Sequence, residues 1–269
     1  MPEAEGHART AEIADGIFAL GNLVDLRRPL SWIPGGVTGF DPSSCYLVLG
    51  DGWPLLVDTG FRTHQAELLD QVRRLVHPGE RLDVALTRVE PDCLGNLKAI
   101  CDEVGVARIS SQSNVIPLDY LGPYSQDYPD VVINNGLLPG DEIRLADDRC
   151  LEVVQPPVRT LPTLWLFDKR TGVMFTSDFF GDVQVLNGNW MPQHEGEMEH
   201  ARNHMLAKFD WLGIADVSEP LARLRAIFDE RDVQAIAPGH GLWTVGAGAV
   251  RERVALTTLA LESIGNDRR

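Results

Sequence analysis

Short apolar runs and amphipathic stretches alternate along the first half of the chain, and this order predicts strands and helices in succession. Residues 12–20 are expected to form a pair of strands around a turn at Asp15-Gly16. The runs at 45–49 and 54–57 flank Gly50-Asp51-Gly52, which predicts a hairpin. The pattern then predicts a helix, a strand, a second helix and a further strand, over residues 63–76, 82–86, 94–104 and 106–110.

The second half of the chain shows the same kind of pattern, with predicted strands followed by predicted helices. Strands are predicted over residues 142–145, 150–155, 163–167, 173–176 and 233–237, and helices over 197–212, 217–230 and 248–264. Residues 21–42 are rich in Gly and Pro and are interpreted as a long loop that covers a site, and 182–193 as an irregular segment. Two sheets from successive halves, with helices outside, predict an α/β fold, a four-layer αββα sandwich. Because no low-complexity linker divides the chain, residues 1–269 are expected to form a single domain.

Composition narrows the classes of function. The chain has 269 residues, with 24 Lys and Arg against 39 Asp and Glu, which gives a net charge of −15. Such acidity argues against nucleic acids and anionic membranes as partners, and no apolar run approaches the length of a membrane span. The N-terminus lacks the apolar region of a signal peptide. Four Cys without a CxxC pair predict free thiols in a reducing compartment, so a cytoplasmic location is expected.

Polar clusters follow the predicted strands at four places, which are Asp58-Thr59-Gly60, the turn 87–95, Ser177-Asp178 and 238–241. Functional groups of open α/β sheets gather where strands end. Glu, Asp, Cys and His are also the residue types that bind divalent metal ions. The turn 87–95 alone contains Glu90, Asp92 and Cys93. These positions therefore predict a small-molecule or metal site at one edge of the two sheets.

The order of these motifs resembles the metallo-β-lactamase superfamily, and most closely its flavodiiron and oxygen-binding diiron branch. That branch carries a strand ending in DTG, a turn H-x-E-x-D-H-x-G, a later His, a strand ending in S-D-x-F-G or S-x-D-x-F-G, and a final P-x-H-G. Here the turn reads Arg-Val-Glu-Pro-Asp-Cys-Leu-Gly over residues 88–95. The segment 175–181 (FTSDFFG) and the segment 237–241 (APGHG) are similar to the last two motifs. The resemblance covers most of the chain.

The departures from this pattern change what the resemblance implies. The first metal position of the family keeps Glu90 but has Arg88 and Thr160 where the family has His. A guanidinium cannot ligate a cation and repels one. We therefore expect Arg88 to occupy or guard the first position, paired with Glu90 and Asp178. At most one metal is expected, with iron favoured over zinc, and its candidate ligands are Asp92, Cys93, Asp178, His240 and Glu90.

Three functions remain open from the sequence. The first is O2 or redox chemistry, or sensing, at a modified iron site; the second is hydrolysis by a single metal; the third is a metal-free binding protein or pseudo-enzyme. Arg88, Glu90 and His240 are the candidate catalytic residues. The chain is expected to lack the flavodoxin domain of flavodiiron enzymes, so no FMN is expected, and redox activity would need a separate electron donor. A small-molecule ligand and a homodimer are the expected partners.

Several other residues are given structural roles. Asp58 is expected to bond the backbone around the site, and Cys45 to lie in the core. His200 and His204 have a spacing that can hold a metal, but a solvated face of a helix is the favoured interpretation. His194 is placed in a surface loop.

Overall fold

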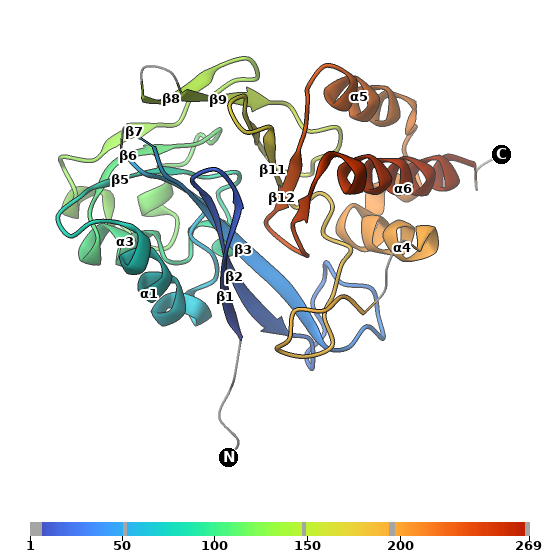
Figure 1. The fold of residues 1–269 in the computed structure, drawn as a ribbon, viewed down its shortest axis with the longest axis horizontal. Helices are drawn as coiled ribbons and strands as arrows, with labels where there is room; N and C mark the ends of the chain where they lie inside the picture. Colours follow the sequence, from blue (N-terminus) through green and yellow to red (C-terminus); the bar gives the residue numbers. More distant parts are fainter. Residues whose placement is uncertain (1–6, 51–52, 147–148, 194–196, 267–269) are drawn as a thin grey trace.

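Two mixed β-sheets form the centre of the protein (Figure 1). The computed structural model describes residues 7–50, 53–146, 149–193 and 197–266. The first sheet contains, in hydrogen-bonded order, β1 (Ala8–Ala14), β2 (Ile17–Asp25), β3 (Phe40–Val48), β4 (Leu55–Val57), β5 (Leu82–Ala85), β6 (Val106–Ser110) and β7 (Val132–Asn134). The second contains β13 (Thr244–Val245), β12 (Ala235–Pro238), β11 (Val173–Ser177), β10 (Trp165–Asp168), β9 (Arg149–Val154) and β8 (Glu142–Ala146).

Helices cover the outer faces of both sheets. The helices beside the first sheet are α1 (Gln65–Leu75), α2 (Pro91–Leu94) and α3 (Leu97–Glu103), and those beside the second are α4 (Met198–Lys208), α5 (Ser218–Asp229) and α6 (Ala247–Asn266). Short 3-10 turns connect several elements, at Arg62–His64, Pro117–Asp119, Ser125–Asp127 and Asp210–Gly213. One apolar cluster lies between the sheets and one lies under each set of helices. The predicted αββα sandwich is therefore confirmed.

Parallel pairing places the polar turns that follow the strands at one edge of each sheet. β4 runs parallel to β5, and β11 runs parallel to β12, so the turns that follow these strands leave from the same edge. The two sheets also touch there. The backbone N–H of Ser44 donates to the carbonyl of Gly239 at 2.9 Å, and the Tyr46 hydroxyl donates to the carbonyl of Pro238 at 2.7 Å. As a result the four polar strand ends of the sequence face a common region.

The structure corrects the interpretation of residues 21–42 as a loop. β2 continues to Asp25 and pairs with β3 from Phe40 onward, so residues 26–39 alone lie outside these strands. Gly21 made the sequence of β2 look like a loop, because Gly is uncommon within strands. A Cβ at this position would lie 2.6 Å from the Trp190 ring, so the packing of Trp190 requires Gly here. The prediction also missed β7 and β13, which have three residues and two residues.

Other expectations about elements are confirmed with shifted ends. The strand pair turns at Asp15-Gly16, and residues 182–193 contain no helix or regular strand. The helix expected over 94–104 is divided into α2 and α3, and the one expected over 197–212 ends at Lys208. Residues 51–52 of the expected hairpin turn lie outside the described residues, although β3 and β4 pair as predicted.

All four cysteines are free, as expected, and Cys45 is buried in the core. Within the described part of the chain, no helix has the length and apolar character that crossing a membrane requires.

Candidate active site

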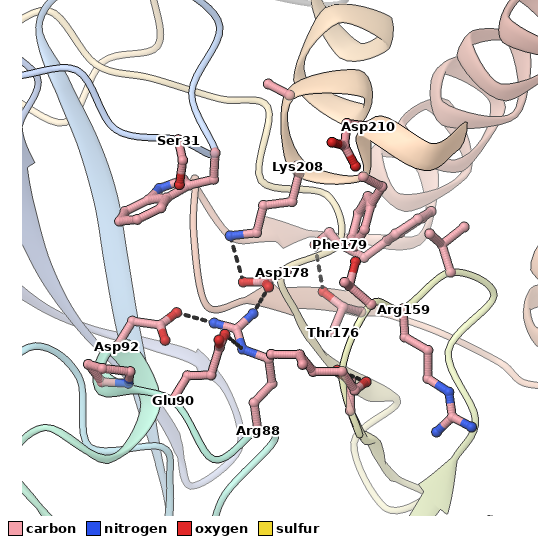
Figure 2. Close-up of a pocket in the computed structure, with 18 of the residues that line it drawn as sticks. Ser31, Arg88, Glu90, Asp92, Arg159, Thr176, Asp178, Phe179, Lys208 and Asp210 are labelled. Carbon is pink, nitrogen blue, oxygen red and sulfur yellow. Dashed lines mark hydrogen bonds and ion pairs between the residues drawn. The ribbon is translucent and has the colours of Figure 1, made fainter. Parts of the chain in front are cut away.

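The polar turns that follow β4, β5, β11 and β12 meet beside a pocket of about 480 Å³. Arg88, Glu90 and Asp92 reach it from the turn after β5, and Asp178 reaches it from the end of β11 (Figure 2). α4 supplies Lys208 from the opposite side. The region thus combines side chains from both sheets with one helix.

The Arg88 guanidinium lies at the centre of the site and contacts carboxylates on three sides (Figure 2). Its Nε lies 3.1 Å from Glu90 Oε2, and its two Nη atoms form ion pairs with Asp92 Oδ2 and Asp178 Oδ2. The expected pairing with Glu90 and Asp178 is therefore present, and Asp92 joins it. The planar fork of N–H donors in a guanidinium suits several carboxylates at once, which a compact ammonium group does not match.

Burial makes each charge in this cluster dependent on its partners. Only 4% of the Arg88 side chain is exposed. Burial by itself would lower the pKa of Arg88, but the surrounding acidic groups raise that pKa above its ordinary value, so the guanidinium stays charged. Burial likewise tends to raise the pKa of Asp92, yet Arg88 and His240 hold it well below its usual range. Loss of one buried partner from such a network costs roughly 3–5 kcal/mol of stability.

His240 follows β12 and lies between two carboxylates. Its Nδ1 is 2.9 Å from Asp41 Oδ2, and its Nε2 is 2.9 Å from Asp92 Oδ2. The Trp32 indole N–H also donates to Asp41 Oδ2, at 3.3 Å. When Nδ1–H donates to a carboxylate, the ring orientation is fixed and Nε2 faces the site, as in metal-ligating histidines. Nε2 and Asp92 would then face each other as two acceptors, and this arrangement requires a proton or a cation beside them.

Asp92, Asp178 and His240 offer ligand atoms that lie within 4.8 Å of one another. Within the described part of the chain, no other set of three His, Cys, Asp or Glu side chains converges in this way. The predicted ligands Glu90 and Cys93 do not belong to this group. The Cys93 Sγ lies 3.8 Å from the Thr87 hydroxyl, and burial raises the pKa of its thiol well above its ordinary value. Since the thiolate is the form that binds metals, this environment weakens Cys93 as a ligand.

The residues present do not fit a pair of metal ions. Arg88 stands where the flavodiiron pattern has a ligating His, its guanidinium already pairs with Glu90, Asp92 and Asp178, and its charge repels a cation beside it. Thr160, at the other altered position, is exposed, and its Oγ1 accepts a hydrogen bond from the Trp211 indole at 3.4 Å. One ion fits the remaining group, because three ligand atoms converge and Asp41 orients the His240 ring.

Asp58 lies beneath the site and bonds the backbone, as expected. Its carboxylate accepts the Thr87 N–H at 2.8 Å and lies 2.7 Å from the Thr87 hydroxyl. The same hydroxyl lies 2.9 Å from the Ser177 hydroxyl, so Thr87 connects the first sheet to the second. Burial raises the pKa of Asp58 to about 7, although the hydrogen bonds from Thr87 oppose this change.

Sequence patterns did not identify Lys208, Asp41 and Trp32 as parts of the site. Lys208 Nζ lies 2.9 Å from Asp178 Oδ1 and 5.2 Å from the centre of the Trp32 ring. Burial and the charge of Arg88 lower the pKa of Lys208 to about 8. Lys208 ends a helix rather than a strand, and Asp41 fell within the stretch interpreted as a loop. Residues 21–42 as a whole were expected to cover a site, and Trp32 of this stretch does line the pocket, whereas no motif in the sequence marks Lys208.

The expectation of a solvated face for His204 is wrong. His204 is 5% exposed and lies on the face of α4 that packs onto the protein, and burial lowers its pKa to about 4. His200 Nε2 lies 3.1 Å from Gln184 Oε1. The two rings are 4.8 Å apart, but the described residues bring no third ligand to them. His194 lies outside the described residues.

Known proteins are similar to this chain in sequence and in fold. A protein named diflavin flavoprotein A 1 from Nostoc sp. (strain PCC 7120) is 25% identical over 239 residues, which cover 87% of this chain and 38% of that protein. A variant of the flavo di-iron protein from Thermotoga maritima matches with a TM-score of 0.72 and 20% identity, covering 95% of this chain and 62% of that one. Rubredoxin oxygen:oxidoreductase from Desulfovibrio gigas matches with a TM-score of 0.67 and 18% identity, covering 94% and 62%.

The chain spans about a third of the length of the curated relatives it matches. The solved structures share the metallo-β-lactamase-like fold of flavodiiron core domains. Their sequence identities to this chain are low, so the match establishes a common fold and not a common function. The family model described as ODP family beta lactamase matches residues 42–241, which contain the strand-end turns described above. This chain therefore belongs to the ODP beta-lactamase family.

Proposed function

We propose that this domain acts in O2-linked redox chemistry or sensing, at a flavodiiron-type site that holds at most one metal ion, with iron favoured. The limit of one metal ion is supported by the Arg88 guanidinium, which pairs with Glu90, Asp92 and Asp178. It supplies positive charge that a first metal ion would otherwise supply to these carboxylates. Related structures include a flavo di-iron protein and a rubredoxin oxygen:oxidoreductase, whose names supply the class of chemistry.

Formal charges support one divalent ion rather than two. Asp41, Glu90, Asp92 and Asp178 contribute four negative charges, whereas Arg88 and Lys208 contribute two positive charges. The difference, 4 − 2 = 2, equals the charge of a single divalent cation beside a neutral His240. A second ion would add two further positive charges to a buried cluster that is already compensated.

The chain's own residues have separate roles in this proposal. Asp92, Asp178 and His240 would hold the ion, and an iron ion there would supply one-electron chemistry and Lewis acidity. Asp41 orients His240, while Arg88 keeps Asp92 ionised and holds Asp178 in place by an ion pair. The adjoining pocket of about 480 Å³ gives a small molecule access to these groups.

Electrons for such a reaction would come from another protein or from a reduced small molecule. The names of the relatives include a flavoprotein and a rubredoxin-linked oxidoreductase, which supports an external donor of that kind. We propose a separate electron donor and a homodimer as partners of this domain.

Iron loading under anaerobic conditions tests the proposal. The full chain, loaded with Fe(II), is predicted to bind no more than one iron per chain and to change its absorption spectrum when O2 is admitted. His240→Asn should abolish tight iron binding, whereas the matched variant His77→Asn, at an exposed position, should keep it. A loaded protein whose spectrum is unaffected by O2 would contradict the redox function. Ester or lactam turnover by the zinc-loaded chain would support the hydrolase instead.

A metal-free binding site is the second candidate, and one observation favours it. Both oxygens of Asp178 already face protein cations, since Oδ2 pairs with Arg88 and Oδ1 pairs with Lys208. Under this alternative the protein would resist chelators without loss of stability, because no bound ion contributes to folding by linkage. A thermal midpoint that falls after chelation would exclude this candidate.

A further inference from the structure

Lys208 brings a second positive charge of the protein into the site. It is the last residue of α4, and its side chain extends from the helix to Asp178 (Figure 2). Nζ lies 2.9 Å from Asp178 Oδ1, and 16% of the Lys208 side chain is exposed. This contact differs from an ordinary surface ion pair, because both partners are largely withdrawn from water.

The two oxygens of Asp178 are divided between two cations. Oδ2 pairs with Arg88 Nη1, whereas Oδ1 pairs with Lys208 Nζ. Oδ1 is also the oxygen that lies 3.8 Å from His240 Nε2. A metal ion bound jointly by Asp178 and His240 would use this oxygen, so the ammonium group and the ion would compete for the same atom.

The surroundings hold Lys208 in this position. The Trp32 ring lies 5.2 Å from Nζ, which is within the range of a cation–π contact. The residue lies at the C-terminus of an eleven-residue helix, where the helix dipole favours a positive charge. Trp32 is in turn fixed by its hydrogen bond to Asp41 and by stacking on Phe61. The ammonium is thus placed before any ligand arrives.

We propose that Lys208 is a built-in competitor for the metal ion, and that it sets how tightly the site binds a divalent cation. Arg88 excludes the first ion, and Lys208 must leave Asp178 Oδ1 before the remaining ion can bind. This inference rests on the proposed one-metal function, since it concerns the same three ligands. It predicts weaker metal binding than Asp92, Asp178 and His240 alone would give.

Calorimetric titration of the metal-free full chain with Co²⁺ tests this inference. Lys208→Gln is expected to bind Co²⁺ at least about tenfold more tightly than the wild type, because a positive charge beside the ion is removed. Lys208→Arg, which keeps the charge, should bind no more tightly than the wild type. Lys98→Gln is the matched control, because Lys98 also pairs with a carboxylate, Asp102, but is exposed. Its affinity should equal that of the wild type.

The outcomes separate this inference from the proposed function. Equal affinities for one Co²⁺ in the wild type and Lys208→Gln would overturn the role of Lys208 and leave the one-metal site standing. Binding by Lys208→Gln alone would support the role of Lys208 and would favour a metal-free wild type. No binding by either protein would contradict both proposals. Thermal unfolding, with Lys208→Met as a second uncharged variant, shows whether each protein is folded.

Discussion

At the scale of single residues, two strained positions support the site from below. Asp58 and Ser177 have φ angles of 59° and 52°, in the left-handed region that residues other than Gly seldom adopt. Asp58 follows β4 of the first sheet and Ser177 ends β11 of the second, and the Thr87 hydroxyl lies within hydrogen-bond distance of both side chains. Strain of this kind persists only where surrounding contacts hold it. Here those contacts fix the turns from which Arg88 and Asp178 enter the site.

The high pKa of Asp58 gives the stability of the protein a pH dependence. Between about pH 4 and pH 7 the folded protein keeps a proton on Asp58 that the unfolded chain releases, so this group destabilises the fold as pH rises through that window. Asp58→Asn removes the effect, and Asn tolerates a positive φ. The free energy of unfolding of the wild type should fall relative to that of Asp58→Asn by a few kcal/mol at most.

Denaturant unfolding at several pH values measures this difference. The exposed variant Asp15→Asn serves as the control and should follow the wild type across the same range. A constant difference between wild type and Asp58→Asn from pH 4 to pH 8 would show that Asp58 is ionised throughout.

The residues that sequence reasoning identified share one property, which is that they follow strands. Arg88, Asp178 and His240 lie in turns after strands, and Asp92 lies in the short helix that follows β5. Their types and spacing are visible without coordinates. Lys208 comes from a helix end far along the chain, so only folding shows that it faces Asp178. Cys93 illustrates the opposite case, because its position suggested a ligand whereas its thiol lies toward Thr87.

At the scale of elements, the short helix α2 determines where Asp92 lies. Its four residues pack against the turn after β4, where the backbone N–H and the hydroxyl of Thr59 both donate to the Cys93 carbonyl, at 2.5 and 3.0 Å. The Asn96 amide donates to the carbonyls of Thr59 and Phe61, at 2.7 and 2.9 Å. This turn-on-turn packing leaves almost no space between the two backbones.

Gly95 is the residue that permits this close approach. A Cβ at this position would lie 2.6 Å from the Gly60 carbonyl oxygen and 2.8 Å from the Arg62 nitrogen, and backbone atoms yield little. Gly95→Ala should therefore lower the free energy of unfolding by about 1–3 kcal/mol and weaken metal binding by moving Asp92. Gly35→Ala is the matched control, since no atom lies within 4 Å of its Cβ. Denaturant unfolding compares the two, and equal stabilities would show that α2 shifts without cost.

Elements with a clear hydrophobic period were predictable, whereas their ends and the shortest strands were not. α1 buries four residues at helical spacing and α5 buries Leu224 and Ile227, three residues apart, and both helices were expected. β7 and β13 are too short for any period to be visible, and they exist because a neighbouring strand supplies hydrogen bonds. The extension of β2 to Asp25 has the same cause, because pairing with β3 outweighs the Gly and Asn in its sequence.

At the scale of the whole molecule, the fold brings four distant stretches of sequence together at one edge. Their order along the chain, rather than any single motif, made the αββα sandwich predictable. The net charge of −15 was less informative, because the site itself combines carboxylates with Arg88 and Lys208. What the sequence could not provide was the count of charges that meet in space, and under the proposed function that count limits how many metal ions the site accepts.

The number of metal ions per chain tests this account most directly. Protein purified without chelator, and the same protein after exposure to excess Fe(II) or Zn²⁺ and removal of unbound metal, would be measured by elemental mass spectrometry against protein concentration. If the Arg88 guanidinium takes the place of the first ion, as proposed, no more than one ion per chain is expected under every condition. Two tightly bound ions per chain would contradict it.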